Sequence, residues 1–252
     1  MSGHSKWATI KRKKGAADAK RSNEFAKLLR AVEVAAREGG SGDPKANMTL
    51  ASAIEKARGS SVPVDNIERA IKRGTGELEG GARYEEVTYE GYGPGGVALY
   101  VETLTDNRNR TAQDVRHAFT RNSGNLGENG STAWMFHRKG LIQIEKDAAP
   151  DEERLLEIAL EAGADDLSDA ESTWEITTDP GAFAGVRDAI SAAGIPMLSA
   201  ELTMVPQSTV PVGGGQARQV LALLEGLEEL DDTQNVYANF DIPESVMAEL
   251  SG

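Results

Sequence analysis

Apolar residues recur at helical spacing through the first third of the chain. In residues 23–40 the pattern is carried by Phe25, Leu28, Leu29, Val32 and Ala36. Residues 42–59 and 61–76 repeat it, and each of the three segments ends in glycine. Side chains three and four positions apart share one face of a helix, so the pattern predicts three helices with a common core. Asp65, followed three positions later by Glu68, is the predicted cap of the third helix.

Alternating apolar and polar residues replace this spacing after residue 80. Segments 85–93 and 96–106 are rich in Val, Tyr and Thr, with glycine and proline between them, and they predict two strands joined by a turn. Residues 109–122 return to helical spacing, with Val115 and Phe119 on the inward face. A loop rich in glycine and asparagine follows.

The segment from residue 133 to residue 206 predicts elements in the order β-α-β-β-α-β. Residues 133–146 are interpreted as two strands around Lys139 and Gly140. The following pattern predicts a helix, a strand, a helix and a strand over residues 151–163, 172–179, 180–194 and 198–206. Two helices on one sheet indicate a split β-α-β sandwich.

The last elements, a helix over 215–230 and a strand over 235–241, have no sheet of their own. The segment after residue 80 lacks a second helix and a closing strand, so the C-terminal pair is expected to complete it. We therefore predict an α+β protein of three domains with ferredoxin-like packing of helices on sheets. The expected domains are a helical domain with a basic arm (1–80), a discontinuous α+β domain (81–132 plus 206–252) and an inserted α+β domain (133–205).

Composition narrows the class of protein. Aromatic residues make up 5% of the 252 residues, so the cores must be aliphatic. The absence of cysteine excludes disulfides and thiolate chemistry and fits a reducing compartment. No apolar run approaches the roughly 20 residues of a membrane helix, and no apolar segment follows the first cations as in a secretory signal. We expect a cytoplasmic protein.

Charge is distributed very unevenly along the chain. The formal net charge is −13. Lys and Arg exceed Asp and Glu by 8 in residues 1–74, whereas the balance is −2 in residues 75–140 and −19 in residues 141–252. A basic start joined to an acidic remainder indicates contact with nucleic acid at one end of the chain.

Several motifs that suggest other chemistry have a simpler interpretation. The G-x-G-x-x-G spacing in "GYGPGG" precedes a strand pattern, whereas a dinucleotide site requires a helix there, so a turn is predicted. The three histidines share no ligand spacing. The carboxylate pairs at 165–166 and 231–232 could bind a hard cation, but such pairs are usually solvated. No catalytic residue, metal site or cofactor is predicted, and an enzyme or metal protein is the alternative.

The basic arm is the main candidate site. Lysines and arginines that could neutralise phosphates are Lys6, Lys11, Arg12, Lys13, Lys14, Lys20 and Arg21. Trp7 could stack on an exposed base. The alternative is a solubilising tail with Trp7 packed on the helices.

A second candidate lies where the predicted helix 109–122 begins. Arg108 and Arg110 are cations at a helix start, where free N–H groups favour anions instead. This conflict indicates either a partner such as phosphate or an ion pair with Glu102 or Asp106, and the sequence does not choose between them.

Five stretches together identify the chain as similar to the YebC/PmpR family: "GHSKWATIKRKK", "YEGYGPGG", "DNRNRTAQDVRHAF", "GNLGENGS" and "LEAGADD". The resemblance runs nearly from end to end, and a eukaryotic relative is a mitochondrial translational activator of cytochrome oxidase. It implies three domains with a discontinuous middle one and no cofactor or catalytic residue. It also makes the basic arm the expected nucleic-acid contact.

The resemblance implies two functions that both involve nucleic acid. One is a DNA-binding transcriptional regulator, the usual description of bacterial members. The other is a translation factor that binds the ribosome and relieves stalling at proline-rich stretches. An extended arm suits backbone contacts and irregular RNA, which slightly favours the second. No membrane and no small-molecule substrate is expected.

Overall fold

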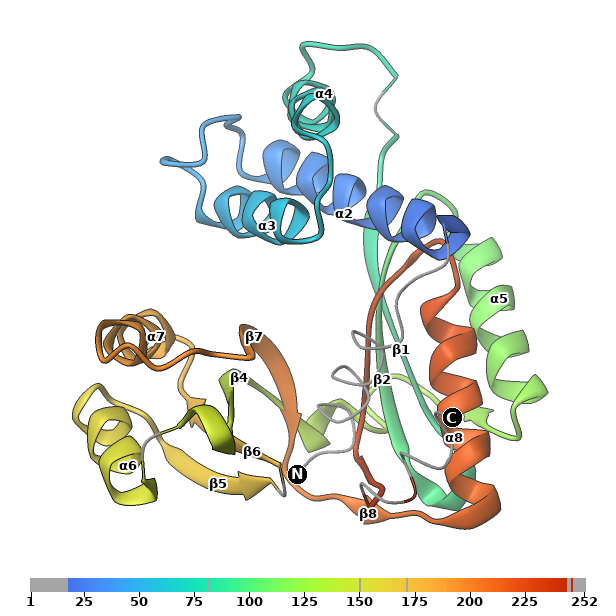
Figure 1. Cartoon of the computed structure of the whole chain (residues 1–252). Helices are drawn as coiled ribbons and strands as arrows, with labels where there is room; N and C mark the ends of the chain where they lie inside the picture. The colour runs from blue at the N-terminus through green and yellow to red at the C-terminus, as the bar shows by residue number, and fades with distance from the viewer. Residues whose placement is uncertain (1–17, 81, 150, 171, 244–245, 247–252) are drawn as a thin grey trace.

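The computed structural model describes residues 18–80, 82–149, 151–170, 172–243 and 246, and only the backbone of residues 18–21. The protein is an α+β protein, as predicted, with an N-terminal group of helices beside two four-stranded sheets (Figure 1). Among the helices described, none is long and apolar enough to cross a membrane.

Three helices form the N-terminal unit: α2 (Asp18–Glu38), α3 (Met48–Gly59) and α4 (Val64–Thr75). Its core consists of the residues Leu28, Val32, Ala35, Ala36, Leu50, Ile54, Ala57, Val62, Ile67 and Ala70. The predicted cap of α4 is wrong, because the helix begins before Asp65. The Pro63 carbonyl already accepts hydrogen bonds from the Asn66 and Ile67 N–H groups, and Asp65 lies in the first turn.

The first sheet has the order β3-β1-β2-β9, with every neighbouring pair antiparallel. Its strands are β1 (Glu85–Tyr92), β2 (Ala98–Thr105), β3 (Asn125–Leu126) and β9 (Thr233–Ala238). Helices α5 (Arg108–Arg121) and α8 (Gly214–Glu228) pack side by side (Figure 1), and Val115, Phe119 and Leu223 belong to the core that they share with the sheet.

The "GYGPGG" motif is a turn between β1 and β2, which confirms that interpretation. Its tip is the 3-10 helix η1 (Pro94–Gly96), in which Gly95 and Gly96 have φ of 74° and 78°. Side chains rarely adopt this left-handed conformation, so glycine is required at the tip for the chain to reverse there.

A buried carboxylate fixes the segment after β3. Glu90, 4% exposed, accepts hydrogen bonds from the backbone N–H groups of Gly130, Thr132 and Ala133 at 2.6–2.7 Å. Burial alone raises the pKa of Glu90, but these three hydrogen bonds outweigh it and hold the pKa below its ordinary value. The Glu90 carboxylate therefore accepts the backbone hydrogen bonds that a neighbouring strand would otherwise accept. The loop that it holds leads into η2 (Ala133–Met135).

The second sheet has the order β5-β6-β4-β7 and is also antiparallel. Helices α6 and α7 pack against one face of this sheet, and the elements have the order β-α-β-β-α-β: β4 (Phe136–Glu145), α6 (Glu152–Glu161), β5 (Asp166–Ala170), β6 (Thr173–Thr178), α7 (Phe183–Ala192) and β7 (Ser199–Pro206). The short turn η3 (Lys146–Ala148) follows β4.

The prediction of two strands around Lys139 and Gly140 is wrong, because β4 is continuous through both residues. Gly140 pairs with Thr178 on one side and Leu202 on the other. A Cβ at Gly140 would lie 2.5 Å from the Phe183 ring, so this glycine allows α7 to approach the sheet and makes no turn. Strand β5 was not predicted from the sequence.

The C-terminal part of the chain returns to the first sheet. Strand β9 pairs with β2, α8 packs beside α5, and the short strands β8 (Val210–Pro211) and β10 (Phe240–Asp241) pair in parallel next to them. In the sequence, the strands of the second sheet thus fall between two segments that together build one core. The domain limits at residues 80, 132 and 205 remain a proposal.

Candidate nucleic-acid interface

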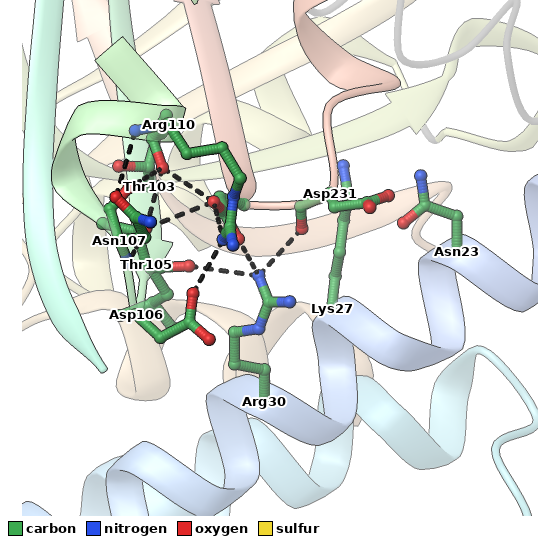
Figure 2. A network of polar contacts seen from close by, with 12 residues as sticks. Asn23, Lys27, Arg30, Thr103, Thr105, Asp106, Asn107, Arg110 and Asp231 are labelled. Atoms are coloured by element: carbon green, nitrogen blue, oxygen red, sulfur yellow. Dashed lines mark hydrogen bonds and ion pairs between the residues drawn. The ribbon is translucent and has the colours of Figure 1, made fainter. Parts of the chain in front are cut away.

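Six of the ten residues predicted to contact nucleic acid lie outside the described residues: Lys6, Trp7, Lys11, Arg12, Lys13 and Lys14. Lys20 and Arg21 lie in the first turn of α2, where only the backbone is described. Arg108 and Arg110 begin α5. The structure brings the starts of these two helices to one junction between the helical unit and the first sheet (Figure 2).

The N-terminal half of α2 lies across the end of α8. The Asn23 side chain donates to the Glu229 carbonyl at 2.9 Å, and the Lys27 ammonium group donates to the Glu228 carbonyl. The last carbonyls of a helix have no partner within the helix and carry partial negative charge. The Asn23 amide and the Lys27 ammonium group therefore supply hydrogen-bond donors to the last carbonyls of α8. Lys20 and Arg21 precede Asn23 in α2 by less than one helical turn.

Asp232 is the centre of the junction. This carboxylate is 5% exposed and accepts from Arg30 Nη1 at 3.0 Å, from Arg110 Nη2 at 2.8 Å and from the Thr111 hydroxyl at 2.7 Å. Burial alone raises the pKa of Asp232. The hydrogen bonds from Arg110 and Thr111 and the charges of Arg110 and Arg30 outweigh it, so its pKa lies below the ordinary value.

Arg30 links three parts of the protein. Besides Asp232, its Nη1 donates to the carbonyls of Leu104 and Asp231, at 3.1 and 2.9 Å, and its guanidinium lies 5.0 Å from the centre of the Tyr84 ring. Nη1 carries two hydrogens and shares them among these three oxygens, so one side chain joins a helix to two strand ends.

Arg110 forms an ion pair, which was one of the two explanations that the sequence analysis gave for a cation at the start of this helix. It donates to Asp106 at 2.7 Å as well as to Asp232, and these hydrogen bonds raise its pKa. The other suggested acceptor, Glu102, bonds instead to Asn235 and Tyr237. Asn107 caps α5 by accepting from the Arg110 N–H at 3.1 Å. A role of Arg110 in binding nucleic acid remains a proposal.

Arg108 is held much less firmly. Its guanidinium lies 3.7 Å from Glu85, and 67% of its side chain is exposed. An exposed pair at this distance is worth less than about 1 kcal/mol. Arg108 can therefore exchange its partner for a phosphate at little cost.

Asp165, Asp166 and Asp231 are exposed, in agreement with the solvated interpretation, and only Asp232 differs from it. Asp232 is buried in the junction, and Asp165 accepts from Lys139 at 2.9 Å. Within the described part of the chain, no group of three histidine, aspartate or glutamate side chains is arranged to hold a metal ion. Nothing in the local sequence indicates that Asp232 pairs with Arg30. The sequence analysis considered Asp232 only as half of a carboxylate pair and did not select Arg30.

The fold and the junction define a class of protein with a helical N-terminal unit tied to an α+β body. The TACO1/YebC N-terminal domain matches residues 5–77, and the second and third domains of TACO1/YebC match residues 84–240. The chain therefore belongs to the TACO1/YebC family.

Relatives are similar over their whole length. Probable transcriptional regulatory proteins of Geobacter sulfurreducens and Rubrobacter xylanophilus are 57% and 56% identical to the chain. The matches cover 99% and 100% of this chain and all of each relative. The crystal structure of a conserved hypothetical protein from Aquifex aeolicus is 47% identical, with a TM-score of 0.76 over 90% of this chain and 92% of that one.

Proposed function

We propose that the protein is a non-enzymatic regulator of gene expression that binds nucleic acid through the cationic start of its chain. The observation that carries this proposal is the separation of charge: +8 in residues 1–74 and −19 in residues 141–252. A polyanion is attracted by the first part and repelled by the second. The names of the relatives, as probable transcriptional regulatory proteins, support regulation as the general role.

Between DNA and ribosomal RNA, the helical unit slightly favours RNA on the ribosome. A helix that reads the major groove needs a face that base edges and phosphates can approach. The exposed residues of α4 alternate in charge, with Asp65 and Glu68 beside Arg69 and Lys72, so its surface is not uniformly cationic. An arm with lysines, arginines and one tryptophan suits irregular RNA with unpaired bases.

The test compares three targets at matched salt: ribosomes, promoter DNA and random duplex DNA. Binding to ribosomes without preference for any promoter is expected. Strong promoter selectivity would instead support the transcriptional role.

The arm is tested by changing Lys11, Arg12, Lys13 and Lys14 to Gln. About four phosphate contacts are removed, so the slope of log K against log salt should become less steep by roughly 3–4. The matched control changes the four cations of the acidic part, Lys146, Arg154, Arg187 and Arg218, to Gln. Equal losses in both variants would show that only net charge matters, and unchanged affinity in the first would exclude the arm as the contact.

A further inference from the structure

Helix α5 presents a cationic face to solvent, of which the sequence analysis selected only Arg108. Arg116, His117 and Arg121 are exposed along it, together with Arg108 at its start. Asp114 is the one acidic residue in the helix. The opposite face is buried, with Val115 and Phe119 in the core. The exposed surface of this helix in an acidic protein therefore carries more cations than anions, with Asp114 as its one carboxylate.

Two cations of this face have no counter-charge among the described residues. Among the residues the structure describes, neither Arg116 nor Arg121 takes part in an ion pair, although the inward-facing Arg30 and Arg110 each do. Even exposed cations of the second sheet's helices are paired: Arg154 with Glu157 and Arg187 with Asp188. Unpaired cations repel each other weakly and gain most from an external anion.

We propose that the outward face of α5 binds the phosphate backbone of nucleic acid as a second contact beside the arm; this inference rests on the proposed function. A helix of 14 residues is about 21 Å long, enough to follow several phosphates. The remaining outward residues, Asn109, Gln113 and Thr120, are uncharged hydrogen-bonding groups. Phe119 is fully buried, so within α5 the one exposed aromatic ring is the imidazole of His117. Cations and uncharged hydrogen-bonding groups make up most of this face, so it is suited to contact the backbone and not to read sequence.

The position of α5 makes this face continuous with the root of the arm. The first turns of α2 lie over the ends of α5 and α8 (Figure 1), and Asp232 joins Arg30 of α2 to Arg110 of α5. Arg108 therefore lies at the end of this face nearest to α2, and Arg116 and Arg121 lie further along the helix. The acidic second sheet lies on the far side of the first sheet from α5 (Figure 1).

The experiment measures binding of labelled duplex RNA, duplex DNA and single-stranded RNA over a range of salt concentrations. The variant Arg116→Gln with Arg121→Gln keeps good helix formers on the surface, so the fold is preserved. Affinity should fall about tenfold at low salt, and the salt slope should become less steep by about 2, because two phosphate contacts are lost. The matched control, Arg154→Gln with Arg187→Gln, should retain wild-type affinity.

The outcomes separate this inference from the proposed function. If the arm variant loses binding while the α5 variant keeps both affinity and slope, the inference about α5 is overturned and the proposed function stands. Failure of the wild-type chain to bind any of the three probes would overturn both. A similar loss for RNA and DNA duplexes would support backbone contact, and a loss confined to one sequence would contradict it.

Discussion

Asp232 accepts a hydrogen bond from Arg30 at 3.0 Å, although 202 positions separate the two residues in the chain. The bond joins the first helix described to the turn before the last strand of the first sheet. The buried apolar clusters of the helical unit and of that sheet share no residue. The junction is therefore largely polar and depends on the charge of one carboxylate.

Replacing Asp232 by Asn should lower the free energy of unfolding by about 2 kcal/mol. The neutral amide keeps the shape but loses charge-assisted hydrogen bonds from two guanidinium groups, each worth roughly 1.5–3 kcal/mol, and part of this is recovered because Arg110 is half exposed. Urea unfolding followed by circular dichroism measures the change. Asp188→Asn, on the exposed surface of α7, should have little effect, and equal losses in both would contradict the assigned role.

The stability of the protein should decrease in acid because of Asp232 and Glu90. Both pKa values are lower in the folded protein than in the unfolded chain. Their contribution is therefore fully present above the ordinary carboxyl pKa values of about 3.9 and 4.3, and it is lost as the pH falls through the lower pKa values of the folded protein. Urea midpoints measured from pH 7 to pH 3 should fall more steeply for the wild type than for Asp232→Asn. Parallel curves would show that Asp232 does not contribute.

Replacing Glu90 by Gln should loosen the loop at residues 130–133. The amide has one acceptor oxygen in place of two and adds donors that face backbone N–H groups, so at least one buried hydrogen bond is lost, at a cost of about 1–3 kcal/mol. Hydrogen exchange should accelerate at Gly130, Thr132 and Ala133. Glu128→Gln in the same segment is the control, and unchanged protection in Glu90→Gln would refute the role of the carboxylate.

Two glycines in the helical unit should respond to alanine with opposite signs. At Gly74 a Cβ would lie 2.3 Å from the Glu33 carbonyl oxygen, so α2 and α4 would have to separate, at a cost of about 1–3 kcal/mol. At Gly59, which ends α3, an added Cβ would have no atom of another part of the chain within 4 Å. Alanine at this position should therefore stabilise the fold by up to about 1 kcal/mol. Thermal unfolding of the two variants measures both effects, and destabilisation by Gly59→Ala would contradict this description of the end of α3.

The elements that the sequence predicts well are those whose pattern is local. The apolar stripes of α2 and α5 and the turn at Gly95 depend on residues only a few positions apart. Gly140 misled the prediction because a glycine in a strand and a glycine in a turn look alike until the position of Phe183 is known. Strand β5 was missed because the short run from Asp166 to Ala170 is polar, and its pairing with β6 decides its conformation.

The candidate site shows the same limit. Arg110 was selected because a cation at a helix start is unfavourable, and that local conflict is resolved by Asp106 and Asp232. Arg30 has no such signal, because lysine and arginine are common on helix surfaces and its partner lies near the other end of the chain. Arg116 and Arg121 became candidates only when the structure placed both on the exposed surface of one helix, outside the ion pairs of the described residues.

The closing of the first sheet by β9 sets an order on folding during synthesis. The Ala98 N–H donates to the Asn239 side chain, which lies 141 positions further along the chain. The β1–β2 hairpin therefore cannot pair with β9 until nearly all of the remaining chain has been synthesised. At about 5–20 residues per second the delay is on the order of ten seconds. During that time Leu99 and Val101 lack the cover of α8, while the three N-terminal helices and the second sheet can already form. A nascent chain that stops before residue 233 would thus expose the apolar residues of this unpaired hairpin, and chaperones that bind exposed apolar segments would recognise it.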